Sequence, residues 1–263
     1  MSGDFFARYG PWALVAGASE GLGAEYARQL AAHGLSLVLV ARRAEALAAL
    51  AAQLRAEHSV DVVAAAIDLA DPALVEKVAL AVGDREIGLV VYNAAASLIG
   101  RFLDHGLDET LRVVDVNCRG PIVLAHRFGG PMARRGRGGI LLMSSIAASQ
   151  GSAMIATYAA TKAFNLVLAE GLWDELREHG VDVLACRPGA TRTPAFEASK
   201  PAGNWSPMEP APVVAAALAA LGHGASVVPG WFNRTAAFVM GRLLPRAVAV
   251  RTMGRATRKM YGG

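Results

Sequence analysis

The chain has 263 residues, of which 54% are hydrophobic, a length and composition typical of one large α/β domain. Much of the apolar fraction is alanine, and no window of about 18 residues is free of charged and turn residues, so no membrane span is predicted. Two cysteines, Cys118 and Cys186, are too few for a disulfide framework, and the N-terminus lacks a secretory pattern, so we expect a cytoplasmic protein. The six histidines show no metal-ligand spacing, and no metal site is predicted.

The net charge of +4 is unevenly distributed along the chain. Glu209 is the last acidic residue, and seven basic residues follow it. This basic extension, at about 231–263, could face an anionic membrane, an acidic protein or a phosphorylated ligand. The basic residues of 242–259 do not separate from the apolar ones on a helical wheel, which gives an interfacial helix weak support. We expect the extension to pack on the body or on a second subunit.

A short apolar run at 12–16 predicts the first strand, and the turn Gly17-Ala-Ser-Glu-Gly-Leu-Gly23 follows it. An alanine-rich stretch at 24–33 predicts the next helix. In this context the three glycines allow a tight turn, a close approach to a pyrophosphate and close packing of helix against strand. Free N–H groups at the helix N-terminus favour phosphate, so the segment predicts a nucleotide site.

The second strand, predicted at 35–40, ends at Ala41-Arg42-Arg43. An NAD-selective site usually carries an acidic residue here for the ribose 2′-hydroxyl, and this chain has none. Arg42 and Arg43 could instead bind a 2′-phosphate through charge-assisted hydrogen bonds. The helix predicted at 44–58 starts directly after Arg42 and Arg43. A helix N-terminus carries a partial positive charge, so two arginines are unfavourable there unless an anion lies near. The pattern favours NADPH.

The third strand, predicted at 60–67, ends at Asp68-Leu69. Asp68 could accept a hydrogen bond from an adenine amine, or it could be a carboxylate in solvent, and the local sequence does not decide between the two. The fourth strand, at 87–92, runs into small residues at 93–96 that would let a flat ring lie close.

The run 108–134 predicts a long helix with Asn117 in its middle. An amide is mildly unfavourable inside a helix, so Asn117 either faces solvent or is kept for a hydrogen bond.

The stretch 139–164 brings three polar side chains into one short span. An apolar run ending at Met143 predicts a buried strand with Ser145 at its carboxyl end. Tyr158 follows thirteen residues later, and Lys162 lies four residues beyond it with no helix breaker between them. On one helical face, the ammonium would lower the phenol pKa towards the range useful for acid–base catalysis. Such a pair is common by chance, so the surrounding chain must decide.

A further strand at 181–186 ends at Pro188-Gly189. Residues 194–212 hold five prolines among apolar side chains, which fits a mobile lid better than a packed element. The last strand is predicted at 225–228. Strands that alternate with helices predict an α/β fold, a single Rossmann-type doubly wound domain over 1–263. Its seven-stranded, mainly parallel sheet would carry helices on both faces and ligands at the carboxyl ends.

Together these features resemble the short-chain dehydrogenase/reductase family over nearly the whole chain. The family's T-G-x-x-x-G-x-G motif is matched by 16–23 and its N-N-A-G segment by 92–95. Its helical asparagine, serine, Y-x-x-x-K pair and P-G turn correspond to Asn117, Ser145, Tyr158 with Lys162, and Pro188-Gly189. Two positions depart from the motif, because Ala16 replaces a threonine that ties the glycine turn to the next strands and Ala95 replaces a glycine.

The resemblance implies that NADPH delivers hydride to a carbonyl carbon while Tyr158 donates a proton to the oxygen. Ser145, with Ser144 as the alternative hydroxyl, would bind the carbonyl. Lys162 would lower the Tyr158 pKa and hold the nicotinamide ribose, and Asn117 would position a water that relays protons. The expected cofactor-binding set is Gly17, Ser19, Glu20, Gly21, Leu22, Gly23, Arg42, Arg43, Asp68, Leu69, Asn93, Ala94, Ala95, Tyr158, Lys162, Pro188, Gly189, Thr191 and Thr193.

The substrate is expected to be a small carbonyl or alcohol compound. Five apolar side chains in or after the predicted lid suggest an apolar substrate, although they could equally pack the lid itself. They are Phe196, Trp205, Met208, Trp231 and Phe232. Two other functions stay open. The first is a cofactor-binding sensor or interaction protein without turnover. The second is a 3-oxoacyl-carrier-protein reductase that docks an acidic carrier on the basic tail. The resemblance implies a homodimer or homotetramer paired through helices near 108–134 and 157–178, and no nucleic-acid partner is expected.

Overall fold

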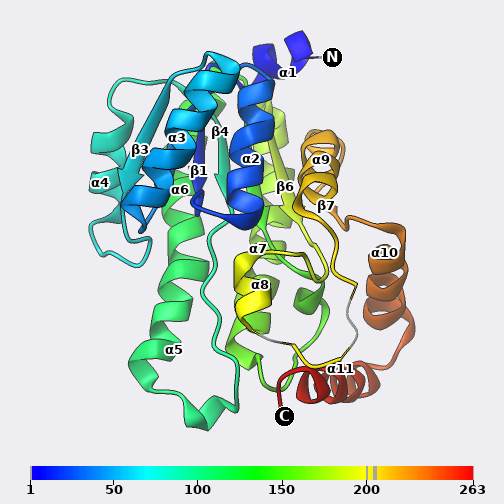
Figure 1. Cartoon of the computed structure of the whole chain (residues 1–263). Coiled ribbons are helices and arrows are strands. Elements are labelled where there is room, and N and C mark those ends of the chain that lie inside the picture. The colour runs from blue at the N-terminus through cyan, green and yellow to red at the C-terminus, as the bar shows by residue number, and fades with distance from the viewer. Residues whose placement is uncertain (1, 200, 204–205, 263) are drawn as a thin grey trace.

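The computed structural model describes residues 2–199, 201–203 and 206–262, and within these ranges seven strands form one sheet (Figure 1). All paired strands run parallel, in the order β3-β2-β1-β4-β5-β6-β7. The strands are β1 (Trp12–Ala16), β2 (Ser36–Ala41), β3 (Val62–Ala66), β4 (Ile87–Tyr92), β5 (Gly138–Met143), β6 (Val181–Cys186) and β7 (Ser226–Val227).

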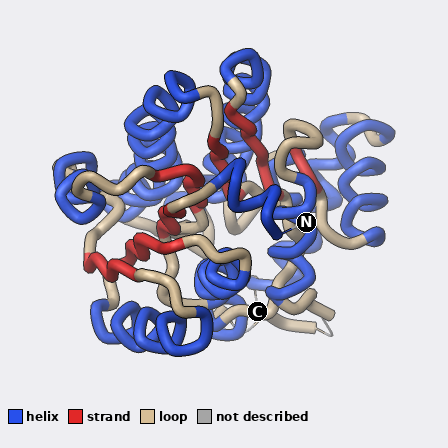
Figure 2. The backbone as a smooth tube through the Cα atoms, turned by 90° about the horizontal axis from the view of Figure 1, so that it is seen from above, coloured by secondary structure: helices blue, strands red, loops and turns tan. Residues whose placement is uncertain are grey.

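Helices cover both faces of the sheet (Figure 2). Neighbouring strand residues such as Leu14 and Val15 belong to different buried clusters, because successive side chains point to opposite faces. One face packs against α2 (Gly21–Ala32), α3 (Ala44–His58) and α9 (Pro210–Ala220). The other packs against α4 (Leu74–Val82), α6 (Gly120–Arg135) and α7 (Ala156–Leu176). Burial on both faces explains why the strands are almost continuously apolar.

The strand order reverses at β1. β2 and β3 lie on one side of β1, and β4 returns to its other side. In open α/β sheets, ligands bind in the crevice outside the carboxyl ends at such a reversal. The glycine turn at 17–23 follows β1 and the small residues at 93–96 follow β4, so both expected cofactor segments border this crevice.

The predicted α/β doubly wound fold is confirmed, and β1, β4, β6 and α3 have the predicted bounds. The long helix predicted at 108–134 consists of α5 (Leu107–Val114), a π-helical turn η2 (Asp115–Arg119) and α6. This turn contains Asn117, and π turns inside α-helices are frequent at functional sites. The other helical segments are α1 (Ser2–Tyr9), η1 (Phe102–Asp104), η3 (Ile146–Ser149), η4 (Arg177–His179), α8 (Pro194–Ala198), α10 (Trp231–Phe238), η5 (Val239–Leu243) and α11 (Arg246–Tyr261).

The segment 194–212, expected as a lid, contains α8 and the first residues of α9. Thr191 and Met208 form an isolated bridge at its base. The segment's last residues belong to a packed helix, because α9 begins at Pro210 and buries one face. Prolines in the first turns of α8 and α9 do not prevent helix formation, since those N–H groups have no helical acceptor. Trp205 lies outside the described residues.

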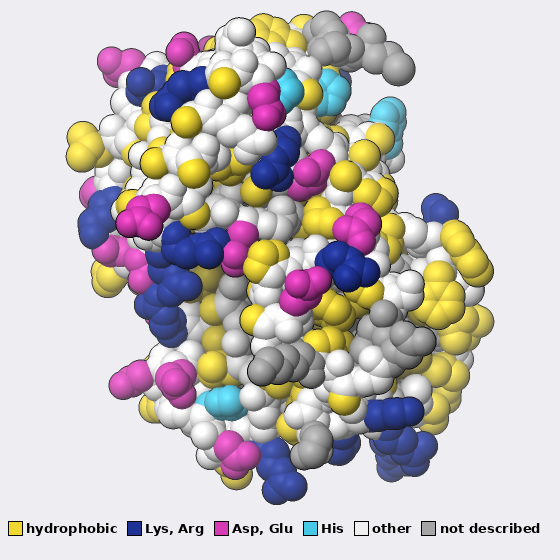
Figure 3. Space-filling view, in the orientation of Figure 1, with side chains coloured by type: hydrophobic (Ala, Val, Ile, Leu, Met, Phe, Trp, Pro, Cys, Tyr) yellow, Lys and Arg dark blue, Asp and Glu magenta, His cyan; other side chains and the backbone are white. Residues whose placement is uncertain are grey.

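The basic extension folds back against the body through α11, while α10 lies at the edge of the molecule (Figure 1). The hydroxyl groups of Ser152 and Thr257 lie 3.1 Å apart in the buried contact of α11 with the segment before α7. α10 has no buried residue, and Figure 3 shows apolar side chains gathered along this edge. In the described ranges, no helix has both the length and the apolar character needed to cross a membrane. The same ranges hold no group of three or more His, Cys, Asp or Glu placed to bind a metal ion.

Candidate active site

The turn after β1 permits close approach of a ligand to the backbone. Gly17 has a φ of 84°, and a Cβ atom on it would lie 2.6 Å from the Ala94 nitrogen. A Cβ atom on Gly23 would lie 1.9 Å from the Gly17 carbonyl oxygen. Asn93 Nδ2 donates to this same oxygen at 2.9 Å and fixes the turn against the end of β4. This cradle, which side chains would fill, fits a dinucleotide pyrophosphate at the N-terminus of α2.

The strand ends remain joined at Ala16, one of the two positions that depart from the family motif. Ala16 is fully buried, and its carbonyl oxygen accepts from the N–H groups of Asn93 and Ala94, both at 2.9 Å. The Gly17 N–H, the first of the turn, also donates to the Val40 carbonyl oxygen of β2 at 2.7 Å. Backbone hydrogen bonds therefore hold the turn to β2 and β4 without a threonine hydroxyl. Ala95 is exposed beyond the end of β4.

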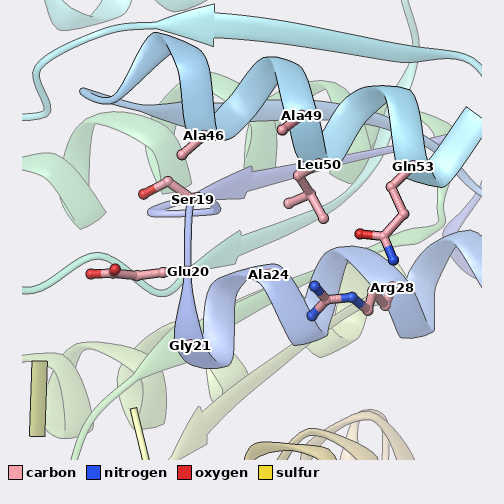
Figure 4. A pocket seen from close by; sticks show the side chains of 9 residues that line it. All are labelled: Ser19, Glu20, Gly21, Ala24, Arg28, Ala46, Ala49, Leu50 and Gln53. Carbon is pink, nitrogen blue, oxygen red and sulfur yellow. The ribbon is translucent and has the colours of Figure 1, made fainter. Parts of the chain in front are cut away.

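Arg42 and Arg43 are exposed at the end of β2, next to the glycine turn. Arg43 Nη2 lies 2.6 Å from Glu20 Oε2 and donates to Ser19 Oγ at 3.2 Å. Ser19 and Glu20 border a cavity of about 370 Å³ between α2 and α3 (Figure 4). Four predicted cofactor residues thus lie together, and the Arg43 guanidinium is already paired with a carboxylate.

Asp68 is bound by the protein itself. Its carboxylate accepts from Arg112 at 2.7 Å and from the Ala70 N–H at 3.0 Å. Burial acts in the opposite direction, but these hydrogen bonds lower the pKa of Asp68. An adenine amine would therefore compete with Arg112. Leu22 packs against the core and Leu69 is buried in it, so both predicted positions have core side chains.

Ser145, Tyr158 and Lys162 lie close together beyond the carboxyl end of β5. Ser145 caps η3, and its Oγ accepts from the Ala147 N–H at 3.1 Å. Tyr158 and Lys162 lie in the first two turns of α7, with Lys162 Nζ 5.6 Å from the centre of the Tyr158 ring. The Ser145 side chain is close enough to Tyr158 to lower its pKa. The three side chains therefore form one cluster, as their spacing in the sequence predicted.

Ser144, the alternative hydroxyl, is part of the scaffold. Its buried Oγ donates to the Lys162 carbonyl oxygen at 2.7 Å, and its N–H donates to the Cys186 carbonyl oxygen at 2.7 Å. These bonds tie β5 to α7 and β6. Ser145 is therefore the hydroxyl beside Tyr158.

Burial dominates the ionisation of the cluster. Lys162 is 2% exposed, its Nζ donates to the Met143 carbonyl oxygen at 2.8 Å, and burial lowers its pKa to about 8. Burial raises the pKa of Tyr158 and outweighs the opposite effect of the Ser145 side chain, and Tyr261 adds to the rise. Lys162 is not among the groups that shift the pKa of Tyr158 in this structure, so the lowering expected from it is not observed here. The phenol keeps its proton at neutral pH.

Asn117 joins the end of β4 to α7. Its buried side chain accepts from the Ala96 N–H at 2.7 Å and donates to the Ala96 carbonyl oxygen at 2.8 Å. Its Nδ2 also donates to Thr161 Oγ1 at 2.9 Å. Asn117 was expected either in solvent or kept for a hydrogen bond, and the second alternative is observed. The side chain holds α7 in place, and its water relay stays a prediction.

The turn after β6 reaches back to the glycine turn. Thr193 caps α8, and its methyl group would lie 3.0 Å from a Cβ atom on Gly21. Buried Thr191 donates to the Gly189 carbonyl oxygen at 3.1 Å. Pro188 accepts from the first N–H of η3 at 3.1 Å. The predicted cofactor residues Thr191 and Thr193 therefore lie on a segment that borders both the glycine turn and the catalytic cluster.

α11 adds residues that the sequence analysis missed. Tyr261 is close enough to Tyr158 to affect its pKa, and the Ser199 side chain at the end of α8 in turn lowers the pKa of Tyr261, against the larger effect of burial. The Ala202 N–H donates to the Met260 carbonyl oxygen at 2.9 Å. No local pattern marks Tyr261, because only the packing of α11 brings it near the site.

The apolar side chains expected to contact substrate have different surroundings. Met208 packs against the core, and its sulfur accepts from Asn233 Nδ2 at 3.2 Å. Trp231 and Phe232 are 74% and 69% exposed on α10. Phe196 is partly buried on α8. Met208 therefore has a packing role, and Trp231 and Phe232 lie on the outer surface.

A family model described as short chain dehydrogenase matches residues 11–203. A 7beta-hydroxysteroid dehydrogenase of Clostridium sardiniense is 30% identical over 88% of this chain and 90% of its own. A very-long-chain 3-oxoacyl-CoA reductase of Laccaria bicolor is 33% identical over 68% of this chain and 54% of its own.

Solved structures agree with these relationships. A structure from a study of 7beta-hydroxysteroid dehydrogenase stereoselectivity gives a TM-score of 0.90 at 27% identity, covering 95% of this chain and 98% of its own. A short-chain dehydrogenase from Sphingobium yanoikuyae in complex with NADPH gives 0.77 at 35% identity, covering 83% and 87%. The chain belongs to the short-chain dehydrogenase family. It is a nicotinamide-dependent oxidoreductase that acts on hydroxyl or carbonyl groups.

Proposed function

We propose that this protein uses NADPH to reduce a ketone or aldehyde to an alcohol, or catalyses the reverse oxidation. The observation that carries the proposal is the cluster of Ser145, Tyr158 and Lys162 at the carboxyl end of β5. This cluster lies two strands from the glycine cradle after β1, on the same edge of the sheet. A dinucleotide along that edge would extend from the cradle to the cluster.

When bound, NADPH would supply the hydride for the carbonyl carbon. Ser145 would donate a hydrogen bond to the carbonyl oxygen, where one donor contributes roughly 3 kcal/mol in the transition state. Tyr158 would give its proton to the same oxygen, since burial keeps the phenol protonated at neutral pH. Lys162 would hold the nicotinamide ribose and, as a cation, stabilise the phenolate left behind. Water near Asn117 would then restore the proton.

The test is a panel of ketones and aldehydes with NADPH, followed at the nicotinamide absorbance, with Tyr158→Phe as the matched variant. We expect turnover by the wild type and a loss of about 10²- to 10⁴-fold in the variant, which keeps the ring and lacks the proton donor. Equal turnover by both proteins would refute the mechanism. Tight NADPH binding without any turnover would favour the alternative, a cofactor-binding sensor.

The preference for NADPH is supported by Arg42 and Arg43 at the end of β2, where no acidic residue follows the strand. The Sphingobium yanoikuyae neighbour is a complex with NADPH, which agrees with the proposal. A bound 2′-phosphate would take the place of the Glu20 carboxylate as the partner of Arg43.

The names of the relatives suggest two apolar substrate classes, hydroxysteroids and long-chain 3-oxoacyl compounds. The second agrees with the alternative of a 3-oxoacyl reductase that uses a carrier. Turnover of a 7-oxosteroid and of a 3-oxoacyl thioester, measured side by side with NADPH, would distinguish these classes.

We also propose a cytoplasmic homodimer or homotetramer that pairs through α5, α6 and α7. Exposed apolar side chains on the outer surfaces of these helices support this pairing: Leu107, Leu111, Val114, Ile122 and Val167. A reducing compartment is supported by the two free cysteines, Cys118 and Cys186.

A further inference from the structure

A cavity of about 510 Å³ lies at the start of α7, the helix that carries Tyr158 and Lys162. Three segments that are distant in sequence form it: the start of η1, the residues that lead into α7, and the end of α11. Its volume is within the range of small-molecule sites, about 300–1,000 Å³. Its walls are formed by Arg101, Phe102, Ala153, Met154, Ala156, Arg258 and Gly262.

Hydrogen bonds hold the three segments together. The Gly100 N–H donates to the Met154 carbonyl oxygen at 2.8 Å, which joins the start of η1 to the segment before α7. The hydroxyl groups of Ser152 and Thr257, 3.1 Å apart and buried, join that segment to α11. The cavity is therefore a defined feature of the fold.

The cavity lies at the N-terminal end of α7, the helix that carries Tyr158. Ala156 in its wall lies two residues before Tyr158, and Gly262 directly follows Tyr261. Tyr261 lies close enough to Tyr158 to affect its ionisation. The cavity therefore lies within one helical turn of the reacting phenol along α7.

Two guanidinium groups from different segments give the cavity a positive charge. Among the described residues, neither Arg101 nor Arg258 has a carboxylate within 4.0 Å. Arg258 Nη1 donates to the Gly254 carbonyl oxygen of its own helix at 3.1 Å, and α11 contains no acidic residue. The remaining side chains of the wall are apolar. A cavity with an apolar wall and two guanidinium groups matches an apolar molecule that carries an anionic group.

We infer that the substrate is an apolar carbonyl or alcohol compound with an anionic group, which Arg101 and Arg258 bind while the reacting carbon lies at Ser145 and Tyr158. This inference rests on the proposed function. Guanidinium groups bind carboxylate and phosphate through paired, charge-assisted hydrogen bonds. The anion belongs either to a free carboxylic acid or to the phosphate of an acyl carrier.

Binding of three eight-carbon probes tests the inference without any turnover. Octanoate, octyl phosphate and octanol share the apolar chain and differ in the head group, and calorimetry with the full-length protein gives their Kd values. We expect at least one anion to bind about tenfold or more tightly than octanol, because hydrogen bonds to charged groups are the stronger ones. The preferred anion identifies the source of the charge.

The variants Arg101→Ala and Arg258→Ala should each weaken anion binding about tenfold and leave octanol binding unchanged. Arg258→Lys should restore part of the loss. Arg255→Ala is the matched control, since Arg255 is exposed on α11 and does not line the cavity, and it should bind all three probes like the wild type.

Equal affinity for the three probes, or no measurable binding of any, would overturn the inference. An effect of Arg255→Ala equal to that of Arg258→Ala would also overturn it, because general attraction by a basic helix would then explain the preference. Reduction of neutral ketones without an anion preference would leave the proposed function standing and remove this inference. Anion selectivity without turnover of any ketone would leave the anion-binding site standing and remove the proposed function.

Discussion

The buried amine next to the reacting phenol gives the site its own pH dependence. Lys162 has a pKa of about 8 because burial disfavours its charge, while the pKa of Tyr158 is raised above its usual 10. We expect kcat/KM for reduction to fall as the pH rises through about 8, since a neutral amine no longer stabilises the phenolate. A pH–rate profile measures this, and constant kcat/KM up to about pH 9.5 would show that Lys162 does not act as a cation.

Loss of folding does not explain such a fall in rate. Between its folded pKa of about 8 and its ordinary value of 10.5, Lys162 binds a proton only in the unfolded chain. The contribution of this group to stability therefore increases with pH across that window. Lys162→Met should retain little activity and show no fall centred near pH 8.

The pairing of Arg43 with Glu20 leads to a prediction about cofactor choice. We expect the wild type to prefer NADPH over NADH by tenfold or more in kcat/KM, about 1.4 kcal/mol, which one phosphate contact can provide. Glu20→Gln should lower the KM for NADPH and leave that for NADH unchanged, because it removes the carboxylate that now binds Arg43. Equal kcat/KM for the two cofactors in the wild type would disprove the preference.

Arg42→Asp is the complementary change and should reverse any preference. Arg28→Ala is a suitable control, since Arg28 lies on α2 beside the same cavity but interacts with Glu25 of its own helix.

At the residue scale, local spacing was informative and long-range pairing was not. Ser145, Tyr158 and Lys162 lie in one strand, turn and helix unit, so their separation in sequence determines their proximity in space. The ion pair of Arg43 with Glu20 depends on how β2 lies beside the glycine turn. The approach of Tyr261 depends on the packing of the last helix, which no short-range pattern records.

Among the elements, the junction of β4 with α7 depends on the side chain of Asn117. Asn117→Ala would leave both backbone groups of Ala96 without their side-chain partner, while the Thr161 hydroxyl would lose one donor and keep its bond to the Tyr158 carbonyl oxygen. We expect the free energy of unfolding to decrease by about 2 kcal/mol or more, since each buried polar group left unpaired costs about 1–3 kcal/mol. Urea denaturation monitored by circular dichroism measures the change.

Asp108→Ala, at an exposed position of α5, serves as the control and should stay within about 0.5 kcal/mol of the wild type. A similar small change for Asn117→Ala would mean that water replaces the amide and that the junction does not depend on it.

The elements themselves were predicted where composition was unambiguous. Apolar runs bounded by glycine, proline or acidic residues gave β1, β4 and β6 correctly. The π turn η2 was not expected, because the sequence around Asn117 has ordinary helical composition. The start of α9 was missed because its prolines were interpreted as breakers, whereas a first helical turn accepts them.

For the whole molecule, sheet order and cofactor edge follow from the alternation of strands and helices, since parallel connections leave few topologies. The position of the basic extension does not follow from that alternation. The extension was expected to pack on the body or on a second subunit, and α11 does pack on the body, with its Thr257 against Ser152, and forms one wall of the cavity. That contact joins residues far apart in the chain.

The outer surface of α5 predicts how the whole molecule assembles. Leu107 and Leu111 lie one helical turn apart and are 71% and 50% exposed, which favours burial against a second copy. We expect the wild type to be a dimer or tetramer, and Leu111→Glu to reduce it to a smaller species, because a buried carboxylate in an apolar interface lacks a partner. Sedimentation velocity at about 10 μM gives the masses, in the usual concentration range for weak association. Leu80→Glu, at an 87% exposed leucine of α4, is the matched control and should leave the oligomer intact. Dissociation by both variants would point to general destabilisation, and a monomeric wild type would rule out pairing through α5.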